Sequence, residues 1–200
     1  MQDVLIATTV LGVGLLLFEV LARKLSPSPP VSRKLLHVGM AACVILVSSR
    51  VPYRHFVVVS IIFFVLIMLL RRKRLLHTLS YRADSSYGDL FFPLGVGAAA
   101  VLAENAPAFM VTVAVLGLAD TAAFIVGRTI AGPRLYRTKT ISGWVACAVA
   151  TATLLAITGY GWRVAVVGSG IIATTELLSL RGSDNLTVPV ACALLLAVLA

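Results

Sequence analysis

Long apolar runs alternate with short polar linkers along all 200 residues of the chain. The runs lie near residues 4–22, 35–49, 55–70, 90–104, 107–127, 143–159, 162–180 and 186–200. They are longer than typical strands, and a perpendicular membrane helix needs about 20 apolar residues. The pattern therefore predicts an all-α, polytopic membrane bundle of seven or eight segments, some of them tilted or short.

The composition favours a membrane protein. Hydrophobic residues make up 60% of the chain and charged residues only 12%, whereas a soluble globular protein is about 25% charged. No polar segment is long enough to build a core of its own, so we expect one integral membrane domain over residues 1–200. The three cysteines stand in separate apolar runs, which argues against a disulfide framework or a zinc site.

The cations predict an orientation. If eight segments are threaded from an outside N-terminus, only Arg50, Arg54 and Arg163 of the 17 Lys and Arg residues face outward. This is the positive-inside pattern, so the motif loops are expected to face the cytoplasm, in a prokaryotic plasma membrane. The net charge of +9 then reflects topology and contact with lipid headgroups, and we expect no nucleic-acid partner.

One apolar run contains an acid. Asp120 shares a helical face with the small residues Ala123 and Gly127, so its side chain is expected to point into the bundle. A carboxylate in hydrocarbon is costly, which makes it a candidate functional residue. Glu176 and Asp184 stand near the predicted cytoplasmic end of a later segment. Because carboxylate oxygens suit Mg²⁺, these three acids form the predicted metal set.

Cations and glycines accompany Asp120, some in the predicted loop at 128–140, some directly beside that loop, and two at the start of the second apolar run. The candidate nucleotide- and phosphate-binding residues are Arg33, Lys34, Gly127, Arg128, Lys139, Ser142 and Gly143. Arginine binds phosphate through two N–H groups and lysine acts as a point charge, while a helix beginning at Ser142 would favour an anion at its N-terminus. His37 follows Arg33 and Lys34 at one-turn spacing. The predicted catalytic residues are Asp120, His37 and Lys139, with the proton acceptor left open between His37 and an acid.

The motifs, taken in order, resemble the CTP-dependent polyprenol kinase family, which includes dolichol and phytol kinases. The matching stretches are RKLLH (33–37), SYGDLFFPLG (86–95), GLADTAAFIVGR (117–128), TKTISG (138–143) and ELLSLRGSDNLTVP (176–189). The resemblance implies phosphoryl transfer from a nucleoside triphosphate, usually CTP, to a lipid alcohol such as phytol, a polyprenol or a glyceride. It also implies Mg²⁺ as the metal ion.

The resemblance further implies roles for individual residues. Asp120 is similar to the acid of the family's Gly-x-Gly-Asp motif, and Lys139 to the lysine of its Lys-Ser/Thr-x-Glu-Gly element. Gly127-Arg128 is similar to the family's Gly-Lys/Arg motif. Its late acidic motif is similar to Glu176 and Asp184-Asn185 of this chain.

Two positions depart from that pattern. Ala119 stands where the second glycine is usual, and Ile141-Ser142 where Glu-Gly is common. The missing glutamate removes an expected contact to metal or nucleotide.

Two other functions use the same acids and cations. A cytidylyltransferase of the CDP-lipid synthase type would join CMP to a lipid phosphate and release pyrophosphate. A non-enzymatic transporter or scaffold would line a solute path with its acids. Acids gathered at one membrane face, rather than at mid-bilayer, argue against this last reading.

Overall fold

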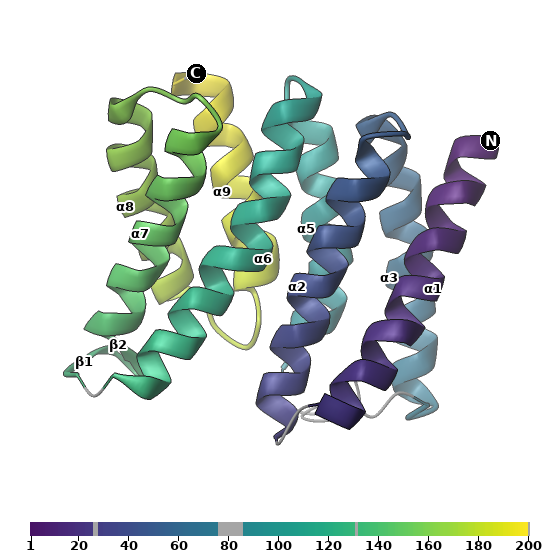
Figure 1. Cartoon of the computed structure of the whole chain (residues 1–200), viewed down its shortest axis with the longest axis horizontal. Coiled ribbons are helices and arrows are strands. Elements are labelled where there is room, and N and C mark those ends of the chain that lie inside the picture. Colours follow the sequence, from purple (N-terminus) through teal and green to yellow (C-terminus); the bar gives the residue numbers. More distant parts are fainter. Residues whose placement is uncertain (26–27, 76–85, 131, 200) are drawn as a thin grey trace.

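The computed structural model describes residues 1–25, 28–75, 86–130 and 132–199. Its α-helices are α1 (Gln2–Leu25), α2 (Pro29–Ser48), α3 (Phe56–Arg72), α5 (Gly88–Leu102), α6 (Ala106–Thr129), α7 (Ile141–Ile157), α8 (Trp162–Leu178) and α9 (Asp184–Leu199). A short 3₁₀ turn, η1 (Tyr53–His55), precedes α3. Each predicted apolar run coincides with one helix, so the predicted all-α class is confirmed (Figure 1).

Four of these helices are long and apolar enough to cross a membrane. They are α1, α2, α6, and α3 taken together with the turn before it. Helices α5, α7 and α9 are shorter apolar helices. At 1.5 Å per residue the 15 residues of α5 extend about 22 Å, less than the ~30 Å hydrocarbon core. The length and composition of the helices therefore support a membrane protein, with four candidate spans among the described residues. The seven or eight membrane segments expected from the sequence remain a prediction.

The apolar side chains on the outer faces fit lipid as the surrounding solvent. Leu5 and Val13 of α1 are 68% and 62% exposed, and Val101, Val149 and Val166 of later helices are exposed to a similar degree. Soluble monomers rarely expose apolar surface so continuously.

Side-chain caps set the starts of α6 and α7. The Asn105 Oδ1 accepts a hydrogen bond of 2.9 Å from the backbone N–H of Ala108, which begins α6. The Thr140 hydroxyl accepts one of 3.2 Å from the N–H of Gly143, so α7 begins at Ile141 instead of Ser142. The difference arises because threonine, and not the following Ser-Gly pair, satisfies the free N–H groups.

The predicted loop at 128–140 contains a hairpin in its second half. Strands β1 (Arg134–Tyr136) and β2 (Lys139–Thr140) pair antiparallel, with Arg137 in the turn at a φ of 51°. This corrects the loop assignment. Strands of two and three residues are too short to show the alternation by which a strand is predicted from sequence. The hairpin brings Lys139 back toward α8.

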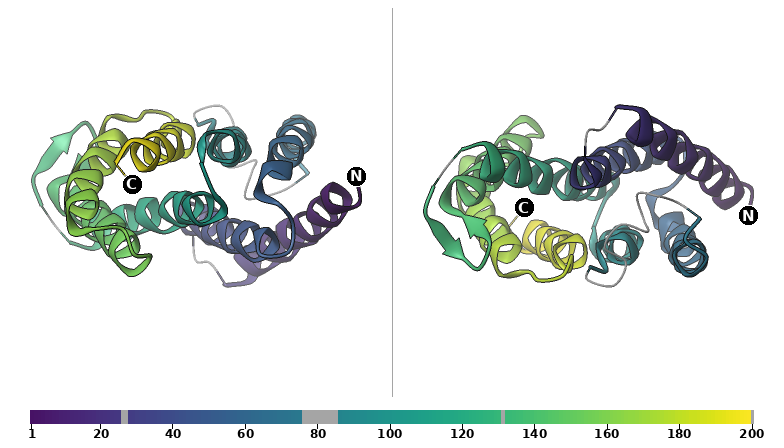
Figure 2. Two further views of the ribbon diagram at one scale, coloured as in Figure 1. Left: turned by 90° about the horizontal axis from the view of Figure 1, so that it is seen from above. Right: turned by 90° about the horizontal axis from the view of Figure 1, so that it is seen from below.

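The helices run alternately up and down, and the two chain termini lie at the same end of the bundle (Figure 1). Seen end-on, α6, α2 and α1 follow one another along one side, α9, α5 and α3 follow one another along the other side, and α7 and α8 lie at one end (Figure 2). The chain can be divided into two halves at the connection between α5 and α6. The N-terminal half consists of α1, α2, α3 and α5, and the C-terminal half of α6, α7, α8 and α9. Helix α2 packs on α6, and α5 packs on α9, so these two helix pairs join the halves.

Candidate functional site

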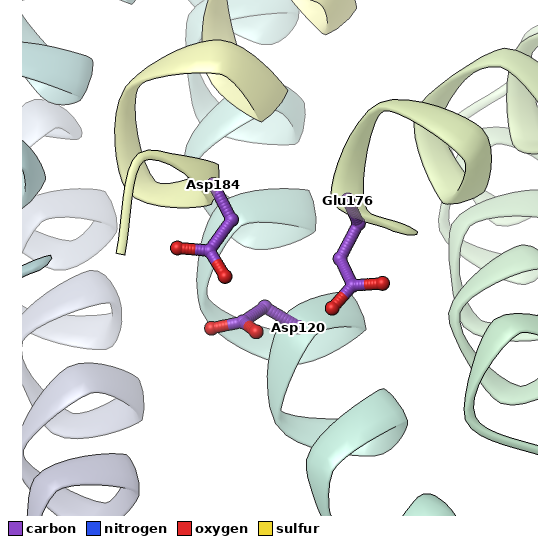
Figure 3. Close-up of side chains that lie close together, drawn as sticks. All are labelled: Asp120, Glu176 and Asp184. Atoms are coloured by element: carbon purple, nitrogen blue, oxygen red, sulfur yellow. The ribbon is translucent and has the colours of Figure 1, made fainter. Parts of the chain in front are cut away.

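Three carboxylates converge where α6, α8 and α9 approach one another (Figure 3). One oxygen from each of Asp120, Glu176 and Asp184 lies within 4.8 Å of the other two. Asp120 and Glu176 are each 5% exposed, and Asp184 is partly buried. The structure thus brings the three predicted metal residues together, from three different helices. Oxygen donors at this spacing suit a hard cation such as Mg²⁺.

The linker between α8 and α9 places two of these acids side by side. Glu176 lies in the last turn of α8, and Asp184 is the first residue of α9. Between them Arg181 and Gly182 have left-handed backbone conformations, with φ of 52° and 88°. This tight reversal directs both carboxylates to the same point. The Asp184 Oδ1 also accepts a 3.0 Å hydrogen bond from the N–H of Asn185.

Two lysines pair with the acid cluster. The Lys34 ammonium forms an ion pair with Asp120 across the interface of α2 and α6. The Lys139 ammonium lies 2.6 Å from the Glu176 Oε1 and 3.8 Å from the Asp184 Oδ2, and it also donates to the Glu176 carbonyl. Two cations beside three carboxylates leave an excess negative charge, which favours a divalent cation.

His37 lies beside Asp120. Its Nε2 is 3.1 Å from the Leu116 carbonyl oxygen and 3.8 Å from the Asp120 Oδ2, and its ring meets Phe92 edge-on at 4.6 Å. The tautomer with hydrogen on Nε2 donates to the Leu116 carbonyl and leaves Nδ1 as an acceptor. His37 therefore occupies the predicted place, while its role as a base remains a prediction.

The predicted phosphate-binding glycines lie at a helix crossing. A Cβ on Gly127 would be 3.0 Å from the Thr140 hydroxyl and 3.4 Å from the Gly143 Cα. A Cβ on Gly143 would be 3.0 Å from the Ala123 carbonyl oxygen. Both glycines thus let α6 and α7 approach closely. Packing explains their presence, and a phosphate-binding role remains a prediction.

The other predicted phosphate-binding residues have separate partners. Ser142 donates a 3.2 Å hydrogen bond to the Ile130 carbonyl. Arg128 is exposed, with its guanidinium 4.9 Å from the centre of the Phe124 ring, and the Lys34 ammonium lies 5.6 Å from the same ring. Arg128 lies in the last turn of α6, about two turns after Asp120. This end of α6 leads into the hairpin.

Arg33 reaches the start of α5. Its Nη2 donates a 3.3 Å hydrogen bond to the Ser86 hydroxyl, and the N–H of Tyr87 donates to the Arg181 carbonyl at 2.9 Å. The Asn185 amide donates to the Gly88 carbonyl at 2.7 Å. These bonds connect the beginnings of α5 and α9, and Arg33 has a structural partner in addition to its predicted role.

A cavity of about 270 Å³ adjoins the cluster. Its polar lining consists of Arg33, Lys34, His37, Ser86, Asp89, Asp120, Asp184 and Asn185, together with Ser60 on α3. Its apolar lining comes mainly from the N-terminal half, through Leu11, Leu15, Met40, Val44, Phe56, Val59, Phe63, Ile67 and Val96. The cavity is thus polar where it includes two of the three clustered acids and the first turns of α2 and α5, and it is mostly apolar along α1, the rest of α2 and α3.

Four polar residues of this lining were not predicted as site residues: Ser60, Ser86, Asp89 and Asn185. Asp89 and Asn185 have the clearest partners. Asp89 accepts a 2.7 Å hydrogen bond from Arg71, and Asn185 connects α9 to α5. Both occur in the motif blocks quoted above. An acid directly after Gly88 at the start of an apolar run is the signal by which Asp89 could have been found.

No protein-family model matches the chain, and neither a curated protein nor a solved structure matches it. The resemblance to CTP-dependent polyprenol kinases therefore rests on the quoted motifs. The acid cluster and the cavity are features of the structure and stand independently of that resemblance.

Proposed function

We propose that this protein is a membrane-embedded lipid-alcohol kinase. It transfers a phosphoryl group from a nucleoside triphosphate, CTP by resemblance, to phytol, a polyprenol or a similar alcohol. The observation that carries the proposal is an apolar cavity whose polar end includes Asp120 and Asp184, with Glu176 beside them. A lipid alcohol needs an apolar slot for its chain, and phosphoryl transfer needs a charged site at the hydroxyl.

The proposal includes a multi-pass topology with an outside N-terminus in a prokaryotic plasma membrane. Several cationic residues cluster at the bundle end that carries the hairpin, including Arg23 and Lys24 in α1 and Arg71 and Arg72 in α3. The positive-inside rule turns this end toward the cytoplasm. The acid cluster then opens on the side where soluble triphosphate is present.

The three clustered acids fit a Mg²⁺ ion. Asp120, Glu176 and Asp184 supply oxygen ligands from three helices, and such an ion binds through a few carboxylates together with phosphate oxygens. When bound, Mg²⁺ would neutralise phosphate charge and orient the transferred group. CTP is the expected co-substrate.

The remaining charged groups suit the charge that develops during transfer. The alcohol oxygen attacks the terminal phosphorus, the bond to the bridging oxygen breaks, and the nucleoside diphosphate leaves with the electron pair. Lys34 and Lys139 at the cluster neutralise the phosphoryl oxygens, and the exposed Arg128 is the proposed contact for the outer phosphates. The hydroxyl proton passes to His37 or Asp120, which lie together in the cavity wall.

A labelled-transfer assay tests the proposal. Purified protein is incubated with Mg²⁺, γ-labelled CTP or ATP, and phytol, a polyprenol or diacylglycerol. We expect label in the lipid, loss of labelling with a chelator, and loss with Asp184→Asn. Asp3→Asn is the matched control, because Asp3 is a half-exposed acid near the chain's N-terminus, at the opposite end of the bundle from the hairpin.

The other outcomes separate the alternatives. Labelled pyrophosphate released only with a phosphorylated lipid would replace the kinase with a CDP-lipid synthase. No turnover with any donor and acceptor would overturn an enzymatic role and favour transport.

A further inference from the structure

A fourth acid lies in the cavity wall, outside the three-acid cluster. Asp89 is the second residue of α5, and its side chain is only 9% exposed. Its Oδ1 accepts the 2.7 Å hydrogen bond from Arg71, and within the described residues its buried Oδ2 has no hydrogen-bond partner. The N–H of Leu90, the next residue, donates to the Tyr87 carbonyl at 3.0 Å instead. A buried carboxylate oxygen without a donor is costly, so Oδ2 suits a donor that a ligand supplies.

Arg71 holds this carboxylate in place. Its guanidinium lies 5.0 Å from the centre of the Tyr87 ring, and the N–H of Tyr87 donates to the Arg181 carbonyl at 2.9 Å. The ion pair connects α3 to α5 and uses one oxygen of Asp89, while an ionised carboxylate accepts at both. The torsion that turns an aspartate carboxylate is soft. A small turn therefore directs Oδ2 toward the cavity while Oδ1 keeps Arg71.

The other acceptors at the polar end of the cavity are engaged. Asp120 is paired with Lys34 and belongs with Asp184 to the three-acid cluster, so in the proposed reaction cations occupy the oxygens of both acids. The Nε2 of His37 donates to the Leu116 carbonyl, which leaves only Nδ1 of that ring as an acceptor. Asp89 thus differs from the other acids of the cavity wall, because one of its oxygens is used by none of the described cations.

Asp89 also lies at the end of the cavity where the hydroxyl is expected. Phe92 follows it by three residues on the same face of α5, and the Phe92 ring meets His37 at 4.6 Å. Asp89, His37 and Asp120 line one cavity from α5, α2 and α6. A hydroxyl at this end has the acids of α6 and α9 for the metal-bound phosphate, and Asp89 of α5 for its own hydrogen.

We propose that Asp89 accepts the proton of the alcohol during transfer. Its Oδ2 first accepts a hydrogen bond from the hydroxyl. As the hydroxyl oxygen forms its bond to the terminal phosphorus, the proton passes to Oδ2. The bond to the bridging oxygen breaks, and its electron pair leaves with the nucleoside diphosphate. The inference rests on the proposed function and puts Asp89 in the place of His37 and Asp120 as the proton acceptor.

Ligand binding tests the acceptor without requiring turnover. The probes are phytanol, the saturated form of phytol, and its methyl ether, which lacks the hydrogen that Oδ2 accepts. Titration calorimetry in detergent should show that the unmodified protein binds phytanol at least about tenfold more tightly than the ether. Asp89→Asn should lose most of this preference, because Arg71 holds the amide oxygen and the amide nitrogen then donates at the Oδ2 position.

Glu19→Gln is the matched control. Glu19 is also a buried acid, 2% exposed and paired with Arg23 at 2.8 Å, but it does not line the cavity. This variant should keep the preference for phytanol over the ether.

Turnover gives a second readout, which a purely structural role would not change. Asp89→Asn should lower kcat about 10²-fold or more. Fluorine atoms on the carbon next to the carbinol carbon make the hydroxyl of phytanol a stronger acid, so its proton needs less help from a base. The loss in Asp89→Asn should therefore be at least about tenfold smaller for the fluorinated alcohol. Any loss in His37→Gln should be equal for the two alcohols.

A double variant keeps the test decisive if Asp89→Asn does not fold. Asp89→Leu combined with Arg71→Met exchanges the whole ion pair for apolar side chains, a change that is often neutral for stability. It should lose the preference for phytanol over the ether to the same extent.

Each other outcome has a distinct meaning. Equal binding of phytanol and its ether by the unmodified protein would overturn the inference, and so would an unchanged preference in the Asp89 variants. Rescue by the fluorinated alcohol in His37→Gln, and not in Asp89→Asn, would return the proton to His37. An Asp89-dependent preference for phytanol without phosphoryl transfer from any donor would instead overturn the proposed kinase and leave Asp89 as a hydroxyl-binding residue.

Discussion

The two halves of the bundle are built differently. In the C-terminal half, α6 and α7 pack closely through Gly127 and Gly143, and interior residues such as Val113 and Leu155 are fully buried. In the N-terminal half, α1, α2, α3 and α5 surround a cavity of about 270 Å³. The dense half holds charges at fixed positions, and the hollow half provides room for an apolar chain.

The charged site needs both halves. The acids Asp120, Glu176 and Asp184 belong to the C-terminal half, whereas Lys34 and His37 come from α2 of the N-terminal half. Packing of α2 on α6, and of α5 on α9, holds these groups in register. Variants in one half, or at the contact between the halves, therefore separate effects on the proposed phosphoryl transfer from effects on the proposed binding of a lipid.

The largest effect is expected at Asp120, which belongs to α6 and pairs with Lys34 of α2 across the contact between the halves. Asp120→Asn keeps the shape and removes the charge, so it should reduce phosphoryl transfer about 10³-fold, which corresponds to several kcal/mol of lost charge stabilisation. Glu19→Gln is the matched control, since it also breaks the ion pair of a buried acid, with Arg23 at 2.8 Å, and Glu19 belongs neither to the three-acid cluster nor to the cavity lining. The measurements are transfer rate and thermal unfolding of both variants. An equal loss of activity in both would show that disrupted ion pairing alone explains the effect.

The next largest effect is expected where α5 packs on α9. A Cβ at Gly95 would overlap the Asn185 carbonyl oxygen and lie 2.8 Å from the Pro189 Cγ. Gly95→Ala should therefore lower the free energy of unfolding by about 3 kcal/mol and displace Asp184. Gly170→Ala has no atom within 4 Å of its Cβ and should be neutral or stabilising by up to about 1 kcal/mol. Equal melting temperatures for the two variants would contradict the close contact between the halves.

The positions of the helices could be predicted because each apolar run is long and ends at charged or turn-forming residues. Helix starts shifted by a few residues where a side-chain cap decided the boundary, as Thr140 does for α7. The hairpin was missed because its strands have only two and three residues. The number of spans was not settled, because helices such as α5 are shorter than the hydrocarbon core is thick.

The candidate site was predictable in its chemistry but not in its geometry. Asp120 was chosen because an acid in an apolar run is costly. Glu176 and Asp184 were added because they stand near the same predicted membrane face and carboxylate oxygens suit Mg²⁺, and the structure places the three acids together. The partners of Lys34 and Lys139 depend on contacts between distant helices, which spacing along one helix does not reveal. The cavity depends on how the side chains of six helices pack against one another, so no sequence pattern indicated it.

A smaller effect is expected from a lysine of the C-terminal half. The Lys139 ammonium lies 2.6 Å from the Glu176 Oε1, so it would compete with a metal ion bound at the cluster. Lys139→Met should therefore tighten Mn²⁺ binding about tenfold, a change of about 1.4 kcal/mol in binding free energy. Phosphoryl transfer should slow in the same variant, because a cation at the phosphates is lost. Titration followed by electron paramagnetic resonance measures the affinity. Lys24→Met, at an exposed position of α1, is the control and should change neither quantity. Weaker Mn²⁺ binding in the Lys139 variant would show that the lysine supports the site and does not compete with the ion.

The smallest effect is expected at Ile141, where the family pattern has an acid. Ile141 is 40% exposed and is the first residue of α7, so a carboxylate there would face free N–H groups at the helix N-terminus. Ile141→Glu should raise the free energy of unfolding by about 0.3–1 kcal/mol at low salt. Ile141→Gln removes the same apolar side chain without adding charge, so the difference between the two variants isolates the helix-dipole effect. Thermal unfolding measures the gain in stability at low and at high salt. A gain for Ile141→Glu that high salt does not reduce would show that the helix dipole is not its cause. A change in the preference between CTP and ATP for glutamate alone would place this helix start at the nucleotide, in the dense half of the molecule.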